Sequence, residues 1–513
     1  MSHSRRDFIK FVVAGSAASG CPVNESLLAV PSPEPKPTPL VEGEHNEICH
    51  QIRDGQVFEH PEPTRSVGIV IVGGGAAGLA AAHFLGGKDW LLLEKEEHFG
   101  GNAYQEDYQG QPFCTGSAYT YRGDDADQLA AEIGLKLAPV NCADPTIVNG
   151  EWVPQTWRSG IDQLPYPKDV REAFKKFRDS LLKIDLKEKM AEFDSEPFSK
   201  YTANYPPEIA EWWNACGQSG WGATVPDTSA LVGIDEVQSN SGEDTRVILP
   251  GGLGCITHRL VEILQPKYKE RMLGDATVVS IVPAKDSVRV TYLRGEKLTT
   301  VSAKAVLMCA PKYITSRLVS GIPSEQKAAM RRIRYIPYAV VNMIFDKPIY
   351  NRAYDTWCPG KTFTDFIVAD WTVRNNPGYQ QKHNILTFYT PLQSDQRSLL
   401  LDEGSCKNLT AGVLADFQKL LPEFAVDPIE IRLYRRGHPM FMSAQGMYTK
   451  TRIAAAQPME RIYFGNADSG GPESLASEAI RLSQVGAEWA NLVLAGKPGA
   501  RELAVKALAP TID

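Results

Sequence analysis

The sequence predicts an α/β fold in which a Rossmann-like domain is interleaved with a second domain of α+β type. First, the β-branched apolar run 67–72 leads through a glycine-rich turn into an alanine-rich stretch of helical length and a second apolar run, 90–94. Second, a buried-strand pattern at 305–311 and a strand followed by an apolar-periodic helix at 462–494 extend this layout late in the chain. Third, 513 residues are enough for two to four domains of ordinary size.

Composition narrows the class of protein. Hydrophobic residues make up 43% of the chain and charged residues 22%, which is typical of globular proteins and excludes disordered, collagen-like and disulfide-scaffold classes. The net charge of −7 provides no basic field for nucleic acid, so no nucleic-acid partner is expected. The nine cysteines include no C-x-x-C pair and no Cys/His ligand spacing, so no metal site is expected. A large enzyme or binding protein fits these observations.

The first twenty residues are predicted to be an export signal and not part of the fold. Residues 4–10 read Ser-Arg-Arg-Asp-Phe-Ile-Lys, and the short apolar stretch that follows completes a pattern that resembles a twin-arginine signal. The expected destination is the periplasm or cell envelope, and removal of the signal changes the net charge from −7 to −9. Residues 18–21 also resemble a lipobox, in which Cys21 would be acylated and tether the chain to a membrane. Whether Cys21 is acylated stays open.

Residues 21–64 are predicted to be a linker. The proline-rich run 31–39 is typical of an extended polyproline-like spacer. A route that exports folded proteins is needed when a cofactor is inserted before export, which makes cofactor motifs the next thing to look for.

A dinucleotide-binding turn follows the strand 67–72. Gly73, Gly75 and Gly78 form G-x-G-x-x-G: the first permits the tight turn, the second lets a pyrophosphate approach, and the third lets the helix pack on the strand. Ala76 and Ala77 begin the helix, whose free N–H groups would face the phosphates. The run 67–87 also lacks charged residues, but its many glycines suit a turn better than a membrane span.

The second strand ends in an acid. Glu94 lies 21 residues after Gly73, where a carboxylate can accept hydrogen bonds from the adenosine ribose, and Lys95 follows it as a further cofactor-binding candidate. Strand, glycine triplet, helix, strand and terminal acid together predict a bound dinucleotide.

The residues after this acid distinguish flavin from nicotinamide. Gly100 and Gly101 form a paired-glycine turn, and the run 94–101 resembles the FAD-binding signature of the flavin amine oxidase superfamily. The resemblance implies that the paired glycines bring the backbone near the FAD pyrophosphate. The following residue, commonly arginine in that superfamily, is Asn102 here, so one phosphate contact is in doubt.

Three later segments follow the order of the same superfamily: 249–264, the strands 278–311, and 462–494. The resemblance implies that Val278 contacts adenine and that a polar residue of the last segment binds the ribityl chain. The spacing leaves both Asn466 and Asp468 open to that role. The N-terminus of the last helix would face the flavin N1 and C2 carbonyl.

The resemblance also implies the domain limits. We expect a discontinuous FAD-binding domain from residues 65–150, 241–330 and 441–505, and a substrate domain from residues 151–240 and 331–440. Trp212, Trp213 and Trp221 of the substrate domain would line either a pocket or a core.

Candidate catalytic residues are few. The amine-oxidising branch typically has a lysine near position 340, but Val340 stands there and Asn342 is the nearest polar residue. Its two aromatic positions fall near Pro439 and Leu475, so the aromatic cage is missing as well. Simple amine oxidation therefore loses support.

The run 434–446 loosely resembles the approach to the final strand in protoporphyrinogen oxidases and carotenoid-type desaturases. Arg435, Arg436 and His438 would bind a substrate carboxylate, or else pair with acidic side chains or FAD phosphates. Covalent attachment of the flavin to His438 or to a cysteine stays open.

The resemblance implies an exported FAD-dependent oxidoreductase that oxidises or dehydrogenates a C–N or C–C bond of a small organic substrate by hydride transfer to flavin N5. Oxygen or a quinone would reoxidise the flavin. Two alternatives stay open: a non-catalytic carrier of the Rab-escort type on the same fold, and a classical amine oxidase despite the missing lysine and cage. Substrate, disulfides and oligomeric state are not predicted.

Overall fold

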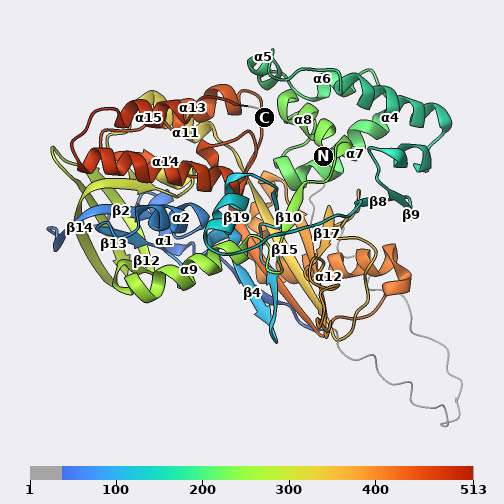
Figure 1. The fold of residues 1–513 in the computed structure, drawn as a ribbon, viewed down its shortest axis with the longest axis horizontal. Helices are drawn as coiled ribbons and strands as arrows, with labels where there is room; N and C mark the ends of the chain where they lie inside the picture. Colours follow the sequence, from blue (N-terminus) through green and yellow to red (C-terminus); the bar gives the residue numbers. More distant parts are fainter. Residues whose placement is uncertain (1–36, 512–513) are drawn as a thin grey trace, which may run out of the picture. The chain divides into compact units, whose positions relative to one another are not determined.

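The computed structural model describes residues 37–511, which form one compact unit (Figure 1). The predicted export signal and Cys21 lie outside the described residues. Within the described part, no helix is both long and apolar enough to cross a membrane. The eight cysteines from Cys49 to Cys406 are all free thiols.

The first sheet has seven strands and confirms the predicted Rossmann-like domain. Its order is β11-β3-β2-β14-β13-β12, and β20 also pairs with β14. β2 is parallel to both of its neighbours, β3 and β14, and β20 is parallel to β14. The bounds are β2 (Arg65–Val72), β3 (Trp90–Leu93), β11 (Met272–Leu273), β12 (Ala276–Pro283), β13 (Val288–Arg294), β14 (Lys297–Met308) and β20 (Ile462–Phe464).

Helices cover both faces of this sheet, so alternate residues of β2 pack into two different cores. Ile69 and Ile71 pack with the helices of one face, and Val70 and Val72 pack with those of the other. The first face holds α2 (Ala76–Leu85), α3 (Asp125–Glu132), α9 (Gly254–Tyr268), α14 (Ala476–Leu494) and α15 (Ala500–Lys506). The second face holds α10 (Lys312–Leu318), α11 (Ser324–Arg332) and α13 (Arg452–Ala455).

The second sheet has eight strands in the order β1-β19-β15-β18-β17-β16-β8-β9. Its third strand, β15 (Tyr335–Phe345), is buried throughout. The other bounds are β1 (Leu40–Gly43), β8 (Pro145–Val148), β9 (Glu151–Pro154), β16 (Asp355–Trp357), β17 (Asp365–Val368), β18 (Asn384–Pro391) and β19 (Glu430–Phe441). β8 and β9, at the end of the segment 65–150 that is expected in the FAD-binding domain, pair within this sheet.

The two faces of the second sheet are covered differently. Helix α12 (Glu403–Leu420) packs on one face through Val413 and Phe417. The other face meets a helical core built from α4 (Lys168–Leu181), α5 (Met190–Ser195), α6 (Ser199–Thr202), α7 (Pro207–Trp221) and α8 (Ala230–Ser241).

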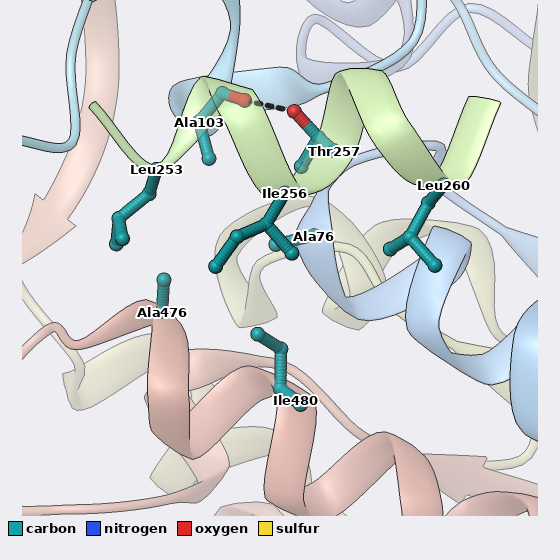
Figure 2. Close-up of a pocket in the computed structure, with 8 residues that line it drawn as sticks. All are labelled: Ala76, Ala103, Leu253, Ile256, Thr257, Leu260, Ala476 and Ile480. Atoms are coloured by element: carbon teal, nitrogen blue, oxygen red, sulfur yellow. Dashed lines mark hydrogen bonds between the residues drawn. The ribbon is translucent and has the colours of Figure 1, made fainter. Parts of the chain in front are cut away.

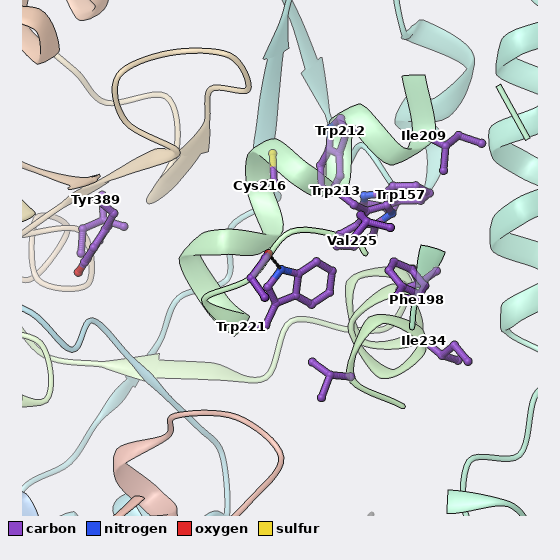
Figure 3. Packing of buried hydrophobic residues seen from close by; sticks show 14 of the residues in the cluster. Trp157, Phe198, Ile209, Trp212, Trp213, Cys216, Trp221, Val225, Ile234 and Tyr389 are labelled. Atoms are coloured by element: carbon purple, nitrogen blue, oxygen red, sulfur yellow. Dashed lines mark hydrogen bonds between the residues drawn. The ribbon is translucent and has the colours of Figure 1, made fainter. Parts of the chain in front are cut away.

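The tryptophans of the second domain form a core. Figure 3 shows Trp212, Trp213 and Trp221 packed with Trp157, and the stacked rings of Trp157 and Trp213 have centroids 5.0 Å apart. All four are at most 5% exposed. Of the two roles predicted for Trp212, Trp213 and Trp221, the structure therefore supports the packing role.

Short strands connect the two domains. A two-stranded sheet pairs β4 (Gln105–Tyr108) with β5 (Gln111–Cys114), and a three-stranded sheet has the order β6 (Thr120–Tyr121), β10 (Arg246–Ile248), β7 (Ala138–Pro139).

The predicted linker 21–64 is structured in its second half. Strand β1 lies parallel to β19, with Leu40 opposite Arg432, and helix α1 (Glu47–Arg53) packs against α10 and β12. The proline run signals an extended chain but gives no information on edge pairing, which depends on a strand that comes about 390 residues later. We call residues 40–53 the N-terminal strap.

The position of α2 depends on one close backbone contact. A Cβ atom at Gly78 would lie 1.8 Å from the carbonyl oxygen of Gly73, a distance that no side chain tolerates. Helix and strand therefore approach each other only because residue 78 is glycine.

We expect Gly78→Ala to destabilise the protein by about 1–3 kcal/mol or more, because the added methyl group must push α2 away from β2. Urea unfolding followed by circular dichroism measures this loss. The control is Gly220→Ala in α7, where no atom lies within 4 Å of the new Cβ. A Gly78→Ala variant as stable as the Gly220→Ala control would contradict the proposed role of the contact.

Candidate active site

The N-terminus of α2 is a ready anion site at the end of β2. Gly73 has a φ of 104°, which lets the chain turn sharply, and Gly75 is the N-cap. No side chain caps the helix and its first turn contains no acid, so the N–H groups of Ala76 and Ala77 are available to a ligand. The geometry suits a diphosphate.

The paired glycines lie against this turn. The N–H of Gly100 donates to the carbonyl oxygen of Gly74 at 2.9 Å, and Gly75 and Gly100 form a parallel bridge. A Cβ at Gly101, where φ is 58°, would lie 3.0 Å from the Cα of Gly75. The two turns therefore meet backbone to backbone, and a cofactor can approach without meeting side chains, as predicted for this motif.

Glu94 is fixed at the carboxyl end of β3. It is 8% exposed, and its two oxygens accept hydrogen bonds from the N–H groups of Gly74 and Glu96. Burial raises the pKa of the Glu94 carboxyl, while the charge of Lys95 acts in the opposite direction. Each oxygen keeps a second lone pair, so the carboxylate can still accept from a ribose hydroxyl.

Lys95 and Glu96 contact the N-terminal strap. The Lys95 ammonium donates to the Glu96 carboxylate and to the carbonyl oxygen of His45. His45 in turn donates its backbone N–H to Glu96 at 3.0 Å and places Nδ1 within 2.5 Å of the same carboxylate. The strap is thus tied to the residues directly after Glu94, a contact that no local sequence signal indicates.

Val278 is the residue expected to contact adenine. It is 7% exposed on β12, at an irregularity in the pairing with β13, and it packs in the same core as Leu91 and Leu93 of β3. The strand that ends in Glu94 and the strand that carries Val278 are therefore neighbours in space.

Asn466 and Asp468 have different environments. The Asp468 carboxylate is fully buried, forms an ion pair with Lys312 at 2.7 Å and accepts a hydrogen bond from the Tyr335 hydroxyl at 2.6 Å. Asn466 is partly exposed, and its side chain forms no hydrogen bond within the described part of the chain. Asn466 is thus the better placed of the two to bind a ribityl hydroxyl, whereas Asp468 is occupied within the protein.

Lys312 and Tyr335 were not singled out by the sequence. Lys312 follows the predicted strand end Ala310–Pro311 directly, and it is 0% exposed. In the sequence, only this position directly after the strand marks Lys312, because its partner Asp468 lies 156 residues away.

The run 435–438 sends its side chains in different directions. Arg435 faces the α12 side, where it donates to the carbonyl oxygen of Leu400 at 2.8 Å. Arg436 faces the opposite side and donates to Thr115. His438 stacks on Tyr313 with ring centroids 4.3 Å apart. Burial and the nearby charges of Arg397, His50, Arg317 and Arg53 lower the pKa of His438 to about 4, so it is neutral near pH 7. The three candidates therefore do not form one site.

Asn342 is buried on the face of the second sheet that looks toward the helical core. Its Oδ1 accepts from the Thr387 hydroxyl at 2.6 Å, and its Nδ2 has no hydrogen-bond partner in the described structure. Val340 and Tyr389 lie on the same face, and the Tyr389 hydroxyl donates to the carbonyl oxygen of Gly116 at 2.8 Å. Leaving the buried Nδ2 donor of Asn342 unpaired is costly, and a substrate that offers a hydrogen-bond acceptor would relieve that cost.

Further along the same sheet lies a charged cluster around Arg246. Arg246 forms ion pairs with Asp144 at 2.6 Å, Asp244 at 2.8 Å and Asp355 at 3.6 Å. Burial raises the pKa of Asp365 to about 7, with a smaller contribution from Asp144. Its ion pairs connect β10 with Asp144, the residue directly before β8, and with Asp355 of β16. Within residues 37–511, no group of three or more His, Cys, Asp or Glu side chains is placed to hold a metal ion.

An apolar pocket adjoins the anion site and shares Ala76 with it. Figure 2 shows its walls, which come from α2, α9 and α14 and hold the hydrogen bond between Thr257 and the carbonyl oxygen of Ala103. The side chains of its lining are uncharged and mostly apolar, so they form a packing seam between the three helices.

The uncapped helix, the two glycine turns and Glu94 fit FAD, and together they define an FAD-dependent oxidoreductase. A family model described as "Flavin containing amine oxidoreductase" matches residues 76–481. The chain therefore belongs to this family.

Curated relatives are distant and partly aligned. The chain is 22% identical over 277 residues to oxidoreductase PigB of Serratia sp., and 23% identical over 316 residues to chloroplastic protoporphyrinogen oxidase 1 of Spinacia oleracea. These alignments cover 50% and 54% of this chain, but only 40% and 56% of the two relatives.

Solved structures share the fold over most of the chain. Putrescine oxidase bound to putrescine superposes with a TM-score of 0.64 at 17% identity, covering 82% of this chain and 98% of that protein. Cyclohexylamine oxidase from Brevibacterium oxydans gives 0.64 at 14% identity, covering 84% and 99%. At these identities the likeness concerns the fold alone.

We expect Lys312→Met to destabilise the protein by about 3–5 kcal/mol, because it leaves the buried Asp468 carboxylate without its cation. The double variant Lys312→Met/Asp468→Asn removes both charges and should recover part of the loss. Urea unfolding of the two variants and the wild type measures the difference. Equal stability of the single variant and the wild type would show that the ion pair is not needed.

Proposed function

We propose that the protein oxidises or dehydrogenates a C–N or C–C bond of a small organic substrate. The observation that carries this proposal is the site that fits FAD, formed at the end of β2 by the uncapped N-terminus of α2, the two glycine turns and Glu94. It belongs to the same compact unit as the second sheet, whose buried face holds Asn342 and Tyr389. The names of the relatives support it, because protoporphyrinogen oxidase and putrescine oxidase are both oxidases.

Bound FAD supplies the redox chemistry by accepting a hydride at N5. Ala76, Ala77, Gly100 and Gly101 would hold its diphosphate, Glu94 its ribose and Asn466 its ribityl chain. The protein contributes binding and orientation: the unused Nδ2 of Asn342 can donate to a substrate acceptor, and burial excludes water from that face. Oxygen or a quinone would reoxidise the flavin.

The absence of a lysine near position 340 argues against a classical amine oxidase. Val340 is buried on the face that carries Asn342, and the buried Lys312 is occupied by Asp468. A substrate that offers a hydrogen-bond acceptor to Asn342 therefore fits better than one that needs a lysine-held water.

Purified protein should carry FAD, seen as flavin absorbance, and its substrate should bleach that absorbance without oxygen. An anaerobic screen of amines, amino acids, indolic compounds and porphyrinogens identifies the substrate class. Protein purified from a native-like host without flavin would contradict the proposal and favour a non-catalytic carrier on the same fold.

Glu94→Ala should weaken FAD binding by about 10- to 100-fold, because it removes a charged hydrogen-bond acceptor from the ribose. Titration of FAD-depleted protein, followed by flavin fluorescence, measures the dissociation constant. The matched control is Glu97→Ala, an exposed acid three residues later. The role assigned to Glu94 fails when the two variants bind FAD equally well.

We also propose export by the twin-arginine route, supported by residues 4–10, with a membrane tether through Cys21 as its finer form. Replacing Arg5 and Arg6 by Lys should keep the protein in the cytoplasm, with Lys36→Arg as control, measured by cell fractionation. Export unchanged by the paired replacement would contradict the route.

Cys21→Ser should release the mature protein from membranes, and a wild type already free of membranes would exclude the tether.

A further inference from the structure

Asn102 cannot supply the cationic contact that its position suggests. Its side chain is neutral, and its Nδ2 donates to the carbonyl oxygen of Pro439 at 2.8 Å. The residue after the paired glycines is therefore used to fasten this turn to the end of β19. At this position the chain therefore offers no cation to the negative charge of a cofactor diphosphate.

Arg436 on β19 contacts the segment Thr115–Gly116, which lies against the same turn. Its guanidinium donates to the carbonyl oxygen of Thr115 and, at 3.0 Å, to the Thr115 hydroxyl. A Cβ at Gly116 would lie 2.3 Å from the carbonyl oxygen of Asn102 and 3.6 Å from Nη1 of Arg436. The guanidinium thus touches the segment that touches Asn102.

A short series of contacts connects Arg436 to the anion site. Asn102 follows Gly101, and Gly101 packs on Gly75, the N-cap of α2. A diphosphate at this helix N-terminus would therefore lie beside the paired-glycine turn, to which Arg436 is connected through Thr115 and Gly116.

Arg436 is also a cation without a counter-ion. Across residues 37–511 no carboxylate forms an ion pair with Arg436, whose side chain is partly buried. Burial lowers the pKa of Arg436, while the charge of Glu44 acts in the opposite direction. Partial burial makes an unpaired charge costly, and a bound anion would relieve that cost.

The neighbouring arginine does not share this position. Arg435 lies opposite Ala339 on β15, on the side of the sheet that α12 covers, whereas Arg436 lies opposite Tyr338 on the other side. Of the two adjacent arginines, only Arg436 lies on the side of the sheet where Thr115 and Gly116 are found.

We propose that Arg436 supplies to the FAD diphosphate the cationic contact that Asn102 does not supply. The planar guanidinium can donate two parallel hydrogen bonds to phosphate oxygens, which suits it to this role better than a lysine. The proposal rests on FAD as the cofactor, and it moves an expected contact from the FAD-binding domain to a strand of the substrate domain.

The test is the affinity of FAD-depleted protein for FAD, measured by flavin fluorescence. Arg436→Gln should raise the dissociation constant about 10- to 100-fold. Adding Asn102→Arg to this variant should restore most of the affinity, because the cation returns to its usual position. Arg435→Gln, which faces the other side of the sheet, should bind FAD as the wild type does.

Salt dependence separates a charge contact from a structural role. The dissociation constant of the wild type should rise with ionic strength more steeply than that of Arg436→Gln. If Arg436→Gln does not fold, judged by circular dichroism, Arg436→Lys replaces it and should bind FAD several-fold more weakly than the wild type.

Equal FAD affinity of the wild type and the Arg436 variant would overturn the proposal. Unchanged FAD affinity together with weaker binding of an anionic substrate would also overturn it, and would assign Arg436 to the substrate. A wild type that takes up no FAD would instead contradict the proposed function, so the two failures are distinguishable.

Discussion

The cofactor site depends on the contact between Gly78 and the carbonyl oxygen of Gly73. A Cβ at residue 78 would lie 1.8 Å from that oxygen, so only glycine fits there. Helix α2 therefore lies directly against β2, and its N-terminus has a fixed direction. Glu94 binds the N–H of Gly74 in the same turn, and Gly100 and Gly101 close on it from the opposite side. The order of the parallel strands brings these three segments together, because each follows the carboxyl end of a central strand or the turn beside it.

The fold and the cofactor turn could be predicted because their signals are local. Strand, glycine spacing and terminal acid occur within 30 residues, and each reflects a turn or a packing requirement of its own segment. The choice between Asn466 and Asp468 needed Lys312, which lies 156 residues from Asp468 and carries no local signal. The strand β1 within the predicted linker could not be foreseen for the same reason, because an edge strand forms only against its partner, here the distant β19.

The second sheet separates packing from chemistry by its two faces. Ala339, Val341 and Met343 of β15 pack toward α12, whereas Tyr338 and Asn342 lie on the face shared with the cofactor turn and the helical core. Side-chain alternation along one strand thus provides both a dry support and a polar wall. The Arg246 cluster adds ion pairs from β10 to Asp144, directly before β8, and to Asp355 of β16.

The N-terminal strap has a consequence for the order of folding. It is synthesised first, yet Glu44 accepts a hydrogen bond from Gly437, 393 residues later, and β1 pairs with β19. On a ribosome the strap has no partner strand until nearly the whole chain has emerged, so its docking is a late event. Until that moment the side chains of Lys95 and Glu96 lack their hydrogen bonds with His45.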